Sequence, residues 1–442
     1  MIVEAPFSEH FVRDAQGELT VDGVRLATIA ATVGTPAYVY SGAALDGAYQ
    51  RVDRALAGVP HLIAYAAKAN GNLAVLARLA RLGAGCDIVS GGELARALRA
   101  GMPPSRIVFS GVGKSASEIE AALAAGIRAI HVESVPELDA IEAIAERRGA
   151  RAPIALRVNP DVDAETHPYI ATGLHGTKFG LELDVARALL PRVLGSAHLL
   201  LEGVACHIGS QLHSAAPLGE AVEIVARFAL ECIAAGAPLR SLDAGGGWPI
   251  AYGDEETDAD PWHEFGAAIR GGLERAGAAA LGLEIIVENG RALVGDAGVL
   301  LARVMYVKEQ SKHGGSSSSE VGPQKSFVVL DAAMTELIRP ALYGAYHAIV
   351  PVRAPTDDAL LRAVDVVGPV CETGDFLALD RPLPPLEQGD LVAIRGAGAY
   401  GMSMASQYNA RPRAPEVLVE GSSFRVVRER ETFDDLMRGE TL

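Results

Sequence analysis

Residues 61–90, HLIAYAAKANGNLAVLARLARLGAGCDIVS, contain one complete copy of the pattern that decides the fold. An apolar run of strand length is followed by an Ala/Leu-rich stretch of helical composition that ends at Gly83, and a second apolar run begins at Cys86. Glycine commonly ends helices because it adopts the left-handed conformation without strain. The order strand, helix, strand predicts a βαβ unit, from which parallel sheets are built.

The same alternation continues to about residue 290. Eight apolar runs are predicted strands: HLIAYAA from His61, CDIVS from Cys86, RIVFS from Arg106, RAIHVE from Arg128, PIALRVN from Pro153, LEGVACHIG from Leu201, SLDAGG from Ser241 and LEIIVEN from Leu283. Eight strands that alternate with helices predict an α/β fold, a closed (β/α)8 TIM-like barrel, which we assign to residues 36–295.

After residue 295 the sequence pattern changes to strand-like runs without helical segments of comparable length between them, such as VLLARVMYVKE from Val299 and DLVAIRG from Asp390. We therefore expect a second, C-terminal β domain of barrel or sandwich type over residues 296–442, which also takes in residues 1–35. The extended run AYVY at 37–40 could pair with it. The Gly/Ser-rich segment 311–325 is expected to form an exposed loop.

Charge and cysteine usage exclude several classes of protein. The 442 residues carry 39 Lys+Arg against 55 Asp+Glu, a net charge of −16, which disfavours a nucleic-acid or anionic membrane surface. The four cysteines form no CxxC pair, so a disulfide framework or zinc ribbon is not expected. The N-terminus lacks the basic start and apolar stretch of a secretory signal, and no run of 18 apolar residues occurs. We expect a soluble, cytoplasmic protein.

Polar residues of four chemical kinds stand where predicted strands end. Lys68 follows the first strand, His207 ends the sixth, three glycines follow the seventh, and Glu288 ends the eighth. A lone lysine at a strand end is most often a solvated charge. In a (β/α)8 barrel, however, the carboxyl ends of all strands meet on one face, where reactive groups gather. The sequence therefore predicts one site there.

The ligand can be argued from these groups together. The run Gly245–Gly247 would let backbone N–H groups approach an anion, although a tight turn explains three glycines equally well. A lysine that can form an imine, a phosphate cradle, a flat-faced histidine and a carboxylate match the requirements of pyridoxal 5'-phosphate.

A set of motifs spans nearly the whole chain in order: YAAKAN around Lys68, HPYIATGLHGTKFG from His167, HIGSQ at His207, the glycine run, ExGR at Glu288, LIRPALYGAYH from Leu337, CETGD from Cys371 and GAYG around Tyr400. This set resembles that of the diaminopimelate decarboxylases, pyridoxal phosphate enzymes of the alanine-racemase-like fold. Two departures from the usual family motifs are visible, Asn289 in place of a proline and Thr373 in place of a serine.

The resemblance implies roles around the cofactor. Lys68 holds it as an imine and then serves as an acid/base, and Glu288 keeps the ring nitrogen protonated so that the ring accepts electrons. His207 stacks on the ring, and Asp87 orients groups near Lys68. The residues implied for the phosphate are Ser210, Gly245, Gly246, Gly247, Gly290, Arg291 and Tyr400.

The resemblance also implies how substrate is bound. The distal end of meso-2,6-diaminopimelate carries a carboxylate and an ammonium, so the site needs both signs of charge. Glu372 takes the ammonium, and Cys371 delivers a proton after decarboxylation. In the family these two residues come from the partner subunit, which implies a homodimer. The residues implied for the distal carboxylate and the rest of the substrate are Arg291, Arg339, Tyr343 and Tyr400. By themselves, Arg339 could form a surface salt bridge and Cys371 could be a small core residue.

Two further signals are weak. His207 and His213 could be metal ligands, but their six-residue gap has no nearby carboxylate pattern, and we predict no metal. The segment SGVGKS at 110–115 resembles the end of a phosphate-binding P-loop, yet that motif needs glycine where Val108 stands.

The predicted function is decarboxylation of meso-2,6-diaminopimelate to L-lysine and CO2, the last step of lysine biosynthesis. A racemase of the same fold would place an arginine at the ring nitrogen, where this chain has Glu288. Related decarboxylases that act on arginine, ornithine or carboxynorspermidine are the nearest alternatives. A non-catalytic regulator that binds the cofactor would be expected to lack Lys68 or Cys371, and both are present.

Overall fold

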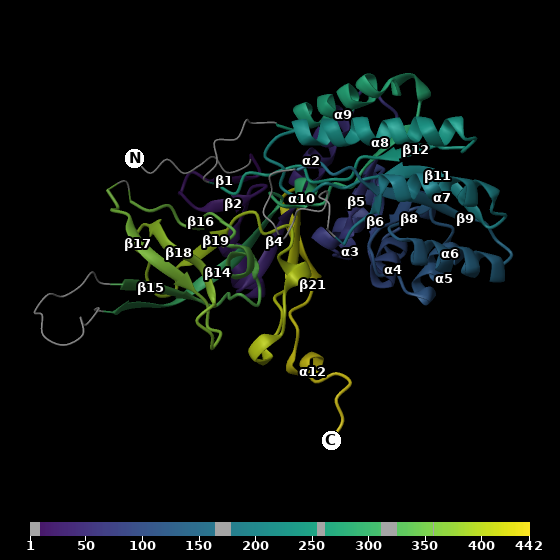
Figure 1. Cartoon of the computed structure of the whole chain (residues 1–442). Helices are drawn as coiled ribbons and strands as arrows, with labels where there is room; N and C mark the ends of the chain where they lie inside the picture. Colours follow the sequence, from purple (N-terminus) through teal and green to yellow (C-terminus); the bar gives the residue numbers. More distant parts are fainter. Residues whose placement is uncertain (1–8, 164–177, 254–260, 311–324, 357) are drawn as a thin grey trace, which may run out of the picture. The chain divides into compact units, whose positions relative to one another are not determined.

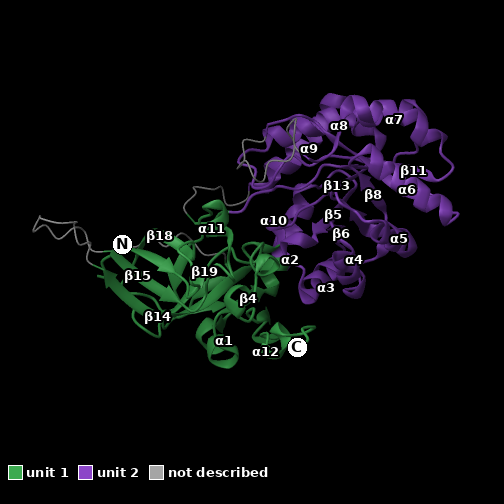
Figure 2. Cartoon of the chain, turned by 60° about the horizontal axis from the view of Figure 1, so that its bottom comes forward, with its two compact units in different colours: residues 1–45, 251–256, 294–442 green, residues 46–250, 257–293 purple. Residues whose placement is uncertain are grey.

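The computed structural model describes residues 9–163, 178–253, 261–310, 325–356 and 358–442. The chain forms two compact units (Figure 2): residues 1–45, 251–256 and 294–442 make up unit 1, and residues 46–250 and 257–293 make up unit 2. Residues 311–324, which are nearly all of the Ser-rich segment, and residues 164–177, which include most of the HPYIATGLHGTKFG motif, lie outside the described residues.

Unit 2 is a closed barrel of eight parallel strands, as the sequence predicts, with its helices outside the strands (Figure 1). Each strand pairs with the next in the chain, and pairing of β13 with β5 closes the barrel. A short β10 (Leu181–Glu182) pairs with β9. The barrel strands are β5 (His61–Ala66), β6 (Gly85–Ile88), β7 (Ile107–Phe109), β8 (Ala129–Val132), β9 (Ala152–Asn159), β11 (Leu199–Ala205), β12 (Ser241–Asp243) and β13 (Glu284–Val287).

Local sequence signals set the helix bounds. Asn72, Ser90, Ser115 and Ser134 cap the first turns of four helices by accepting backbone N–H groups. The helices from this part of the chain are α2 (Gly42–Ala55), α3 (Leu73–Leu82), α4 (Gly91–Arg99), α5 (Ala116–Ala125), α6 (Val135–Arg147), α7 (Leu183–Gly195), α8 (Ala216–Ala234), α9 (Trp262–Ala276) and α10 (Arg291–Val294). Short 3-10 turns are η1 (Ala67–Ala69), η2 (Pro104–Arg106) and η3 (Ala279–Leu281).

Unit 1 is the expected β domain, and it includes the N-terminal segment. Its main sheet has the order β18-β17-β15-β14-β4-β20-β21, with β19 and β16 branching from β14, and β1 to β3 form a small second sheet. The strands are β1 (Phe11–Arg13), β2 (Leu19–Val21), β3 (Val24–Arg25), β4 (Ala37–Ser41), β14 (Gly298–Gln310), β15 (Lys325–Leu330), β16 (Ile349–Pro351), β17 (Arg362–Val367), β18 (Phe376–Leu383), β19 (Leu391–Ile394), β20 (Glu416–Glu420) and β21 (Ser423–Arg428). Its helical segments are α1 (Leu26–Val33), α11 (Arg339–Tyr343), α12 (Phe433–Leu436), η4 (Met402–Met404) and η5 (Tyr408–Ala410).

Strand β4 carries the AYVY run and lies within this sheet. It pairs antiparallel with β14 and parallel with β20, and all five of its residues are buried. Val39 packs in an apolar core with Ile29, Leu301 and Val417. The boundary between the compact units therefore falls after residue 45, whereas the sequence division placed it before residue 36.

The segment between β12 and α9 is also divided between the two units. Residues 251–256 group with unit 1, and within that unit the backbone N–H of Ala348 donates to the carbonyl of Tyr252 at 3.2 Å. In the described part of the chain, no helix is long and apolar enough to span a membrane.

Candidate functional site

Lys68 stands immediately after β5, in the turn η1, at the carboxyl end of the barrel. Its Nζ donates to Oδ2 of Asp87 at 2.8 Å. Asp87 belongs to the neighbouring strand β6 and is fully buried, whereas about a third of the lysine side chain is exposed. Strand pairing thus joins two residues that lie 19 positions apart, and the amine is reachable from outside while its counter-ion is not.

Glu288 lies just beyond β13 and is buried with three side chains from other strand ends. The hydroxyl of Ser110 lies 3.0 Å from Glu288 Oε1 and 3.1 Å from His131 Nδ1. On the far side of the imidazole, His131 Nε2 lies 3.7 Å from Asp243 Oδ2. Sequence reasoning missed Ser110, His131 and Asp243, although each stands at or near the end of a predicted strand.

The surroundings of Glu288 and Asp243 raise the pKa values of both carboxyl groups and so disfavour their ionised forms. Burial, aided by the Asp87 carboxylate, raises the pKa of the Glu288 carboxyl to about 7, although Lys68 and Arg157 lower it. Burial and the proximity of Glu288 raise the pKa of Asp243 well above its usual range. An additional cation beside Glu288 would therefore stabilise its ionised form.

His131, Asp243 and Glu288 also have donor atoms within 4.8 Å of one another, which is close enough for a cation. Hydrogen-bond donors already reach two of these oxygens, since the backbone N–H of Gly245 donates to Asp243 Oδ1 at 2.8 Å and the Ser110 hydroxyl donates to Glu288 Oε1. Asp243 Oδ2, which faces His131, has no hydrogen-bond partner among the described residues. The absence of a metal at this cluster therefore stays a prediction.

His207 is held in one tautomer. The backbone N–H of Gly246 donates to its Nδ1 at 3.1 Å, so the proton of the neutral ring resides on Nε2. Burial, with the positive charges of Arg157 and Lys68, holds the pKa of His207 well below its usual range. The ring is therefore neutral, which suits stacking against a flat ligand.

The run of three glycines is required by the protein's own backbone. A Cβ on Gly246 would lie 2.2 Å from the carbonyl oxygen of Glu288, and one on Gly247 would lie 2.3 Å from that of Gly209. Gly245 and Gly247 also have positive φ angles of 71° and 91°. The tight-turn explanation therefore holds. Because the N–H groups of Gly245 and Gly246 already donate within the protein, the phosphate cradle stays a prediction.

The loop after β13 packs against the loop that carries Lys68. The N–H of Ala66 donates to the carbonyl of Asn289 at 3.3 Å, and a Cβ on Gly290 would lie 2.9 Å from that of Ala69. The guanidinium of Arg291 donates to the Ser210 hydroxyl at 3.2 Å. A guanidinium beside a hydroxyl is a combination that binds phosphate or carboxylate oxygens.

The remaining predicted residues belong to unit 1. Arg339 and Tyr343 are the first and last residues of α11, and Arg339 is only 7% exposed, which rules out the surface salt bridge. Cys371 and Glu372 are exposed between β17 and β18, so Cys371 is not a core residue. The N–H of Cys371 donates to Asn409 at 2.9 Å. Tyr400 follows β19 with a left-handed φ of 55°.

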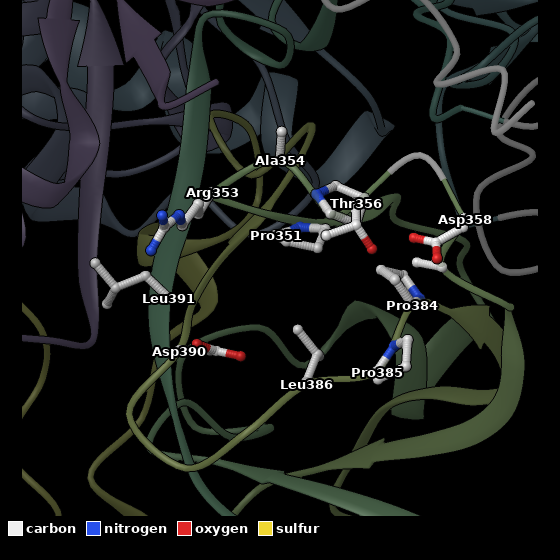
Figure 3. A pocket seen from close by; sticks show the side chains of 12 residues that line it. Pro351, Arg353, Ala354, Thr356, Asp358, Pro384, Pro385, Leu386, Asp390 and Leu391 are labelled. Atoms are coloured by element: carbon white, nitrogen blue, oxygen red, sulfur yellow. The ribbon is translucent and has the colours of Figure 1, made fainter. Parts of the chain in front are cut away.

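A pocket of about 400 Å³ lies in unit 1 near the ends of β16, β18 and β19 (Figure 3). Its charged lining residues are Arg353, Asp358 and Asp390, and its other walls are mostly proline, alanine and leucine. None of the described residues that line it is a predicted site residue, so we do not assign the reaction to this pocket.

The barrel residues fit pyridoxal phosphate on structural grounds. A lysine amine is positioned by a buried carboxylate, the imidazole of His207 is neutral, and a second buried carboxylate would be stabilised by a cation. In addition, Asp87 Oδ1 is buried without a hydrogen-bond partner among the described residues. A buried polar atom of this kind indicates a missing ligand or water.

Comparisons with known proteins also indicate a pyridoxal phosphate enzyme. Residues 43–295 match the family model described as "Pyridoxal-dependent decarboxylase, pyridoxal binding domain". The diaminopimelate decarboxylase of Pseudomonas aeruginosa is 48% identical over 430 residues, which cover 97% of this chain and 98% of that protein. The chain belongs to the diaminopimelate decarboxylase family. The enzyme of Vibrio cholerae is 45% identical over 97% of this chain and 98% of its own length.

Solved structures of family members have the same fold. The diaminopimelate decarboxylase of Helicobacter pylori complexed with L-lysine matches with a TM-score of 0.85 and 44% identity, over 93% of this chain and 98% of that one. The M. jannaschii enzyme in co-complex with L-lysine matches with a TM-score of 0.90 and 35% identity, over 99% of both chains. The cofactor of this family is pyridoxal phosphate.

One departure from the family motif has a structural consequence. Asn289, where the family usually has proline, is 1% exposed, and neither atom of its amide has a hydrogen-bond partner among the described residues. An unsatisfied buried amide costs about 1–3 kcal/mol. Glu288 and Arg291, on either side of it, match the family motif, so the substitution leaves both of these chemical groups in the sequence.

In the cofactor-free protein, the effect of Glu288→Gln on thermal stability should depend on pH. Folding raises the Glu288 pKa from 4.5 to about 7. The carboxyl therefore contributes favourably to the free energy of unfolding below pH 4.5, and this contribution is lost as the pH rises through 7. Glutamine does not ionise, so the melting temperature of the variant relative to wild type should rise between pH 5 and pH 8. Thermal unfolding at both pH values measures this difference.

If Glu288 balances the protonated ring nitrogen of the cofactor, as the resemblance implies, the loaded variant should form product about 100-fold more slowly, because an amide cannot supply that charge. The control is Glu284→Gln at the start of β13, where the carboxylate pairs with Arg128 and is partly exposed. A Glu288→Gln enzyme with wild-type turnover would remove this carboxylate from the reaction.

Proposed function

We propose that this decarboxylase converts meso-2,6-diaminopimelate to L-lysine and CO2 with pyridoxal phosphate as cofactor, the last step of lysine biosynthesis. The observation that carries the proposal is the buried carboxylate of Glu288, at the same end of the barrel as the Lys68–Asp87 pair. A racemase would need an arginine there to weaken the electron sink. The relatives named for this activity match nearly the whole chain.

When bound, pyridoxal phosphate supplies an electron-accepting ring that takes up the charge left as CO2 departs. Lys68 would hold the cofactor through its aldehyde, and as a free amine it could move protons in the site. Asp87, 2.8 Å from this amine, keeps it oriented and compensates its charge. Because Asp87 is fully buried, its position is fixed by β6.

Glu288 holds a proton at the ring nitrogen, and the Ser110 hydroxyl fixes one of its two oxygens. His207, in the neutral tautomer that the N–H of Gly246 imposes, would stack on the cofactor ring. The phosphate-binding residues in this proposal are Ser210, Gly245, Gly246, Gly247, Gly290, Arg291 and Tyr400. Support comes from the Arg291–Ser210 contact, which already pairs a cation with a hydroxyl.

Arg291, Arg339 and Tyr343 bind the distal carboxylate in this proposal, and Tyr400 is a further substrate-binding residue. Glu372 binds the distal ammonium. The burial of Arg339 supports a role in ligand binding, since a desolvated guanidinium interacts strongly with a carboxylate. Cys371 delivers the proton to the carbon that has lost its carboxylate, and its exposure makes the thiol accessible for that step.

We further propose that the enzyme is a cytoplasmic homodimer in which Cys371 and Glu372 complete the site of the partner subunit. The exposure of both residues is compatible with this arrangement. Neither the assembly nor the location is needed for the chemistry of the barrel residues.

The alternative is a decarboxylase for another basic amino acid. The lysine decarboxylase of Selenomonas ruminantium is 24% identical with a TM-score of 0.76, a likeness that concerns the fold alone. The fold therefore does not decide the substrate. Binding of a distal carboxylate by Arg339 is what separates diaminopimelate from ornithine.

Product identification tests the proposed function. The purified enzyme, loaded with pyridoxal phosphate, is incubated separately with meso-diaminopimelate, ornithine, arginine and carboxynorspermidine, and each product is identified by mass spectrometry. We expect L-lysine from diaminopimelate and negligible products from the others. Efficient decarboxylation of one of the other three, with diaminopimelate left intact, would reassign the enzyme.

A further inference from the structure

Arg339 is held by a buried histidine that has no assigned role. His347 is completely buried, and its Nε2 lies 2.7 Å from Nη1 of Arg339. Its Nδ1 lies 2.7 Å from the backbone carbonyl of Arg395. Since a carbonyl can only accept a hydrogen bond, Nδ1 must carry the proton, and Nε2 of the neutral ring must accept from the guanidinium. The two contacts therefore fix the tautomer of His347.

The third member of this arrangement is Tyr252, from the segment that follows the glycine run. The Arg339 guanidinium lies 4.7 Å over the Tyr252 ring, and Tyr252 meets His347 edge to face at 4.9 Å. Gly396, with a φ of 65°, gives the tyrosine its space, because a Cβ there would lie 2.9 Å from the ring. The guanidinium thus has a hydrogen-bond acceptor at one end and an aromatic face beneath its plane.

The backbone carbonyl of His347 is fixed as well. Arg381, itself stacked 3.8 Å over the Tyr346 ring, donates to this carbonyl at 2.7 Å. His347 is therefore anchored on its main chain and at both ring nitrogens. An arginine loses less conformational freedom on binding a ligand when its guanidinium is already oriented.

We propose that His347 and Tyr252 are positioning residues that set the enzyme's selectivity for the distal carboxylate of its substrate by orienting Arg339. The inference rests on the proposed function, which gives Arg339 that ligand. Both residues act on substrate binding and leave the chemical step unaffected, because neither belongs to the set that surrounds Lys68. Loss of either should thus affect KM far more than kcat.

Two substitutions at His347 test the proposal. The amide of His347→Gln reaches the position of Nε2 and offers Arg339 an acceptor, whereas that of His347→Asn reaches only the position of Nδ1. We expect His347→Asn to raise the KM for meso-diaminopimelate about 10-fold with kcat within about 3-fold of wild type, because a charge-assisted hydrogen bond is lost. His347→Gln should restore KM to within about 3-fold of wild type.

Inhibition constants separate the carboxylate from the rest of the ligand. The product L-lysine retains the distal carboxylate, so its inhibition constant should rise with KM in His347→Asn. That of 1,5-diaminopentane, which has no carboxylate, should stay unchanged, as should the affinity for pyridoxal phosphate. Tyr252→Leu and Tyr252→Phe form a second pair, in which only the leucine variant loses the aromatic face and raises KM.

Equal KM values in wild type, His347→Asn and Tyr252→Leu would overturn the inference, and so would a fall in kcat without a change in KM. Should His347→Asn fail to fold, the Tyr252 pair gives the same decision. A wild-type enzyme that leaves diaminopimelate unchanged would instead contradict the proposed function, and this inference with it.

Discussion

Lys68→Ala is expected to abolish lysine formation from meso-diaminopimelate, with a loss of at least about 10⁴-fold, because the variant has no amine to hold the cofactor or to move protons. About a third of the lysine side chain is exposed, so its removal opens little buried space. The change leaves the fully buried carboxylate of Asp87 without its counter-ion, which should lower the stability of the barrel. Release of CO2 and formation of lysine measure the effect.

Lys325→Ala is the matched control. Lys325 is also partly exposed and also pairs with a buried carboxylate, that of Asp365 at 2.6 Å, but in the β domain. Turnover in this variant should stay within about 2-fold of wild type, as is usual for partly exposed ion pairs. Substantial lysine production by Lys68→Ala would overturn the assignment of Lys68.

Cys371→Ser is expected to slow turnover about 100-fold while the cofactor stays bound, because a hydroxyl is a far weaker acid than a thiol. The control is Thr373→Ser, which restores the usual family residue in the same exposed turn and should leave turnover unchanged. Steady-state kinetics with meso-diaminopimelate measure both. Wild-type turnover in Cys371→Ser would show that another group delivers the proton.

Mixing the Lys68→Ala and Cys371→Ser variants tests whether Cys371 acts across the interface of the proposed dimer. If sites are shared, a dimer of one Lys68→Ala and one Cys371→Ser protomer has one site with both changes and one site with neither. Equal mixing should then restore about a quarter of wild-type activity, because half of the dimers are mixed and each has one intact site. No recovery after verified exchange of subunits would place Cys371 in the site of its own chain.

The barrel could be predicted because its signals are local. Each strand is a continuous apolar run, and each run is followed by a segment of helical composition, as at His61–Ser90. The residues that end these runs, Lys68 among them, could also be placed, since parallel strands put their carboxyl ends on one face. The sequence did not decide which domain strand β4 belongs to, because its partners β14 and β20 are more than 250 residues away.

The polar groups that support the site could not be predicted. His131 lies within an apolar run, and nothing in that run indicates that Ser110 and Asp243 stand on either side of its ring. His347 lies in a motif that supplied Arg339 and Tyr343, but its role depends on the carbonyl of Arg395, 48 residues on. The glycine run indicated an anion, while close backbone contacts explain it equally well.

The central claim is that one lysine at the carboxyl end of the barrel carries the cofactor. Its most direct test adds pyridoxal phosphate to the cofactor-free protein, reduces the complex with borohydride and maps the modified peptide by mass spectrometry. We predict a new visible absorption band and a single pyridoxyl-modified residue, Lys68. A protein that stays colourless with no trapped adduct, or one modified at another lysine, would contradict the account.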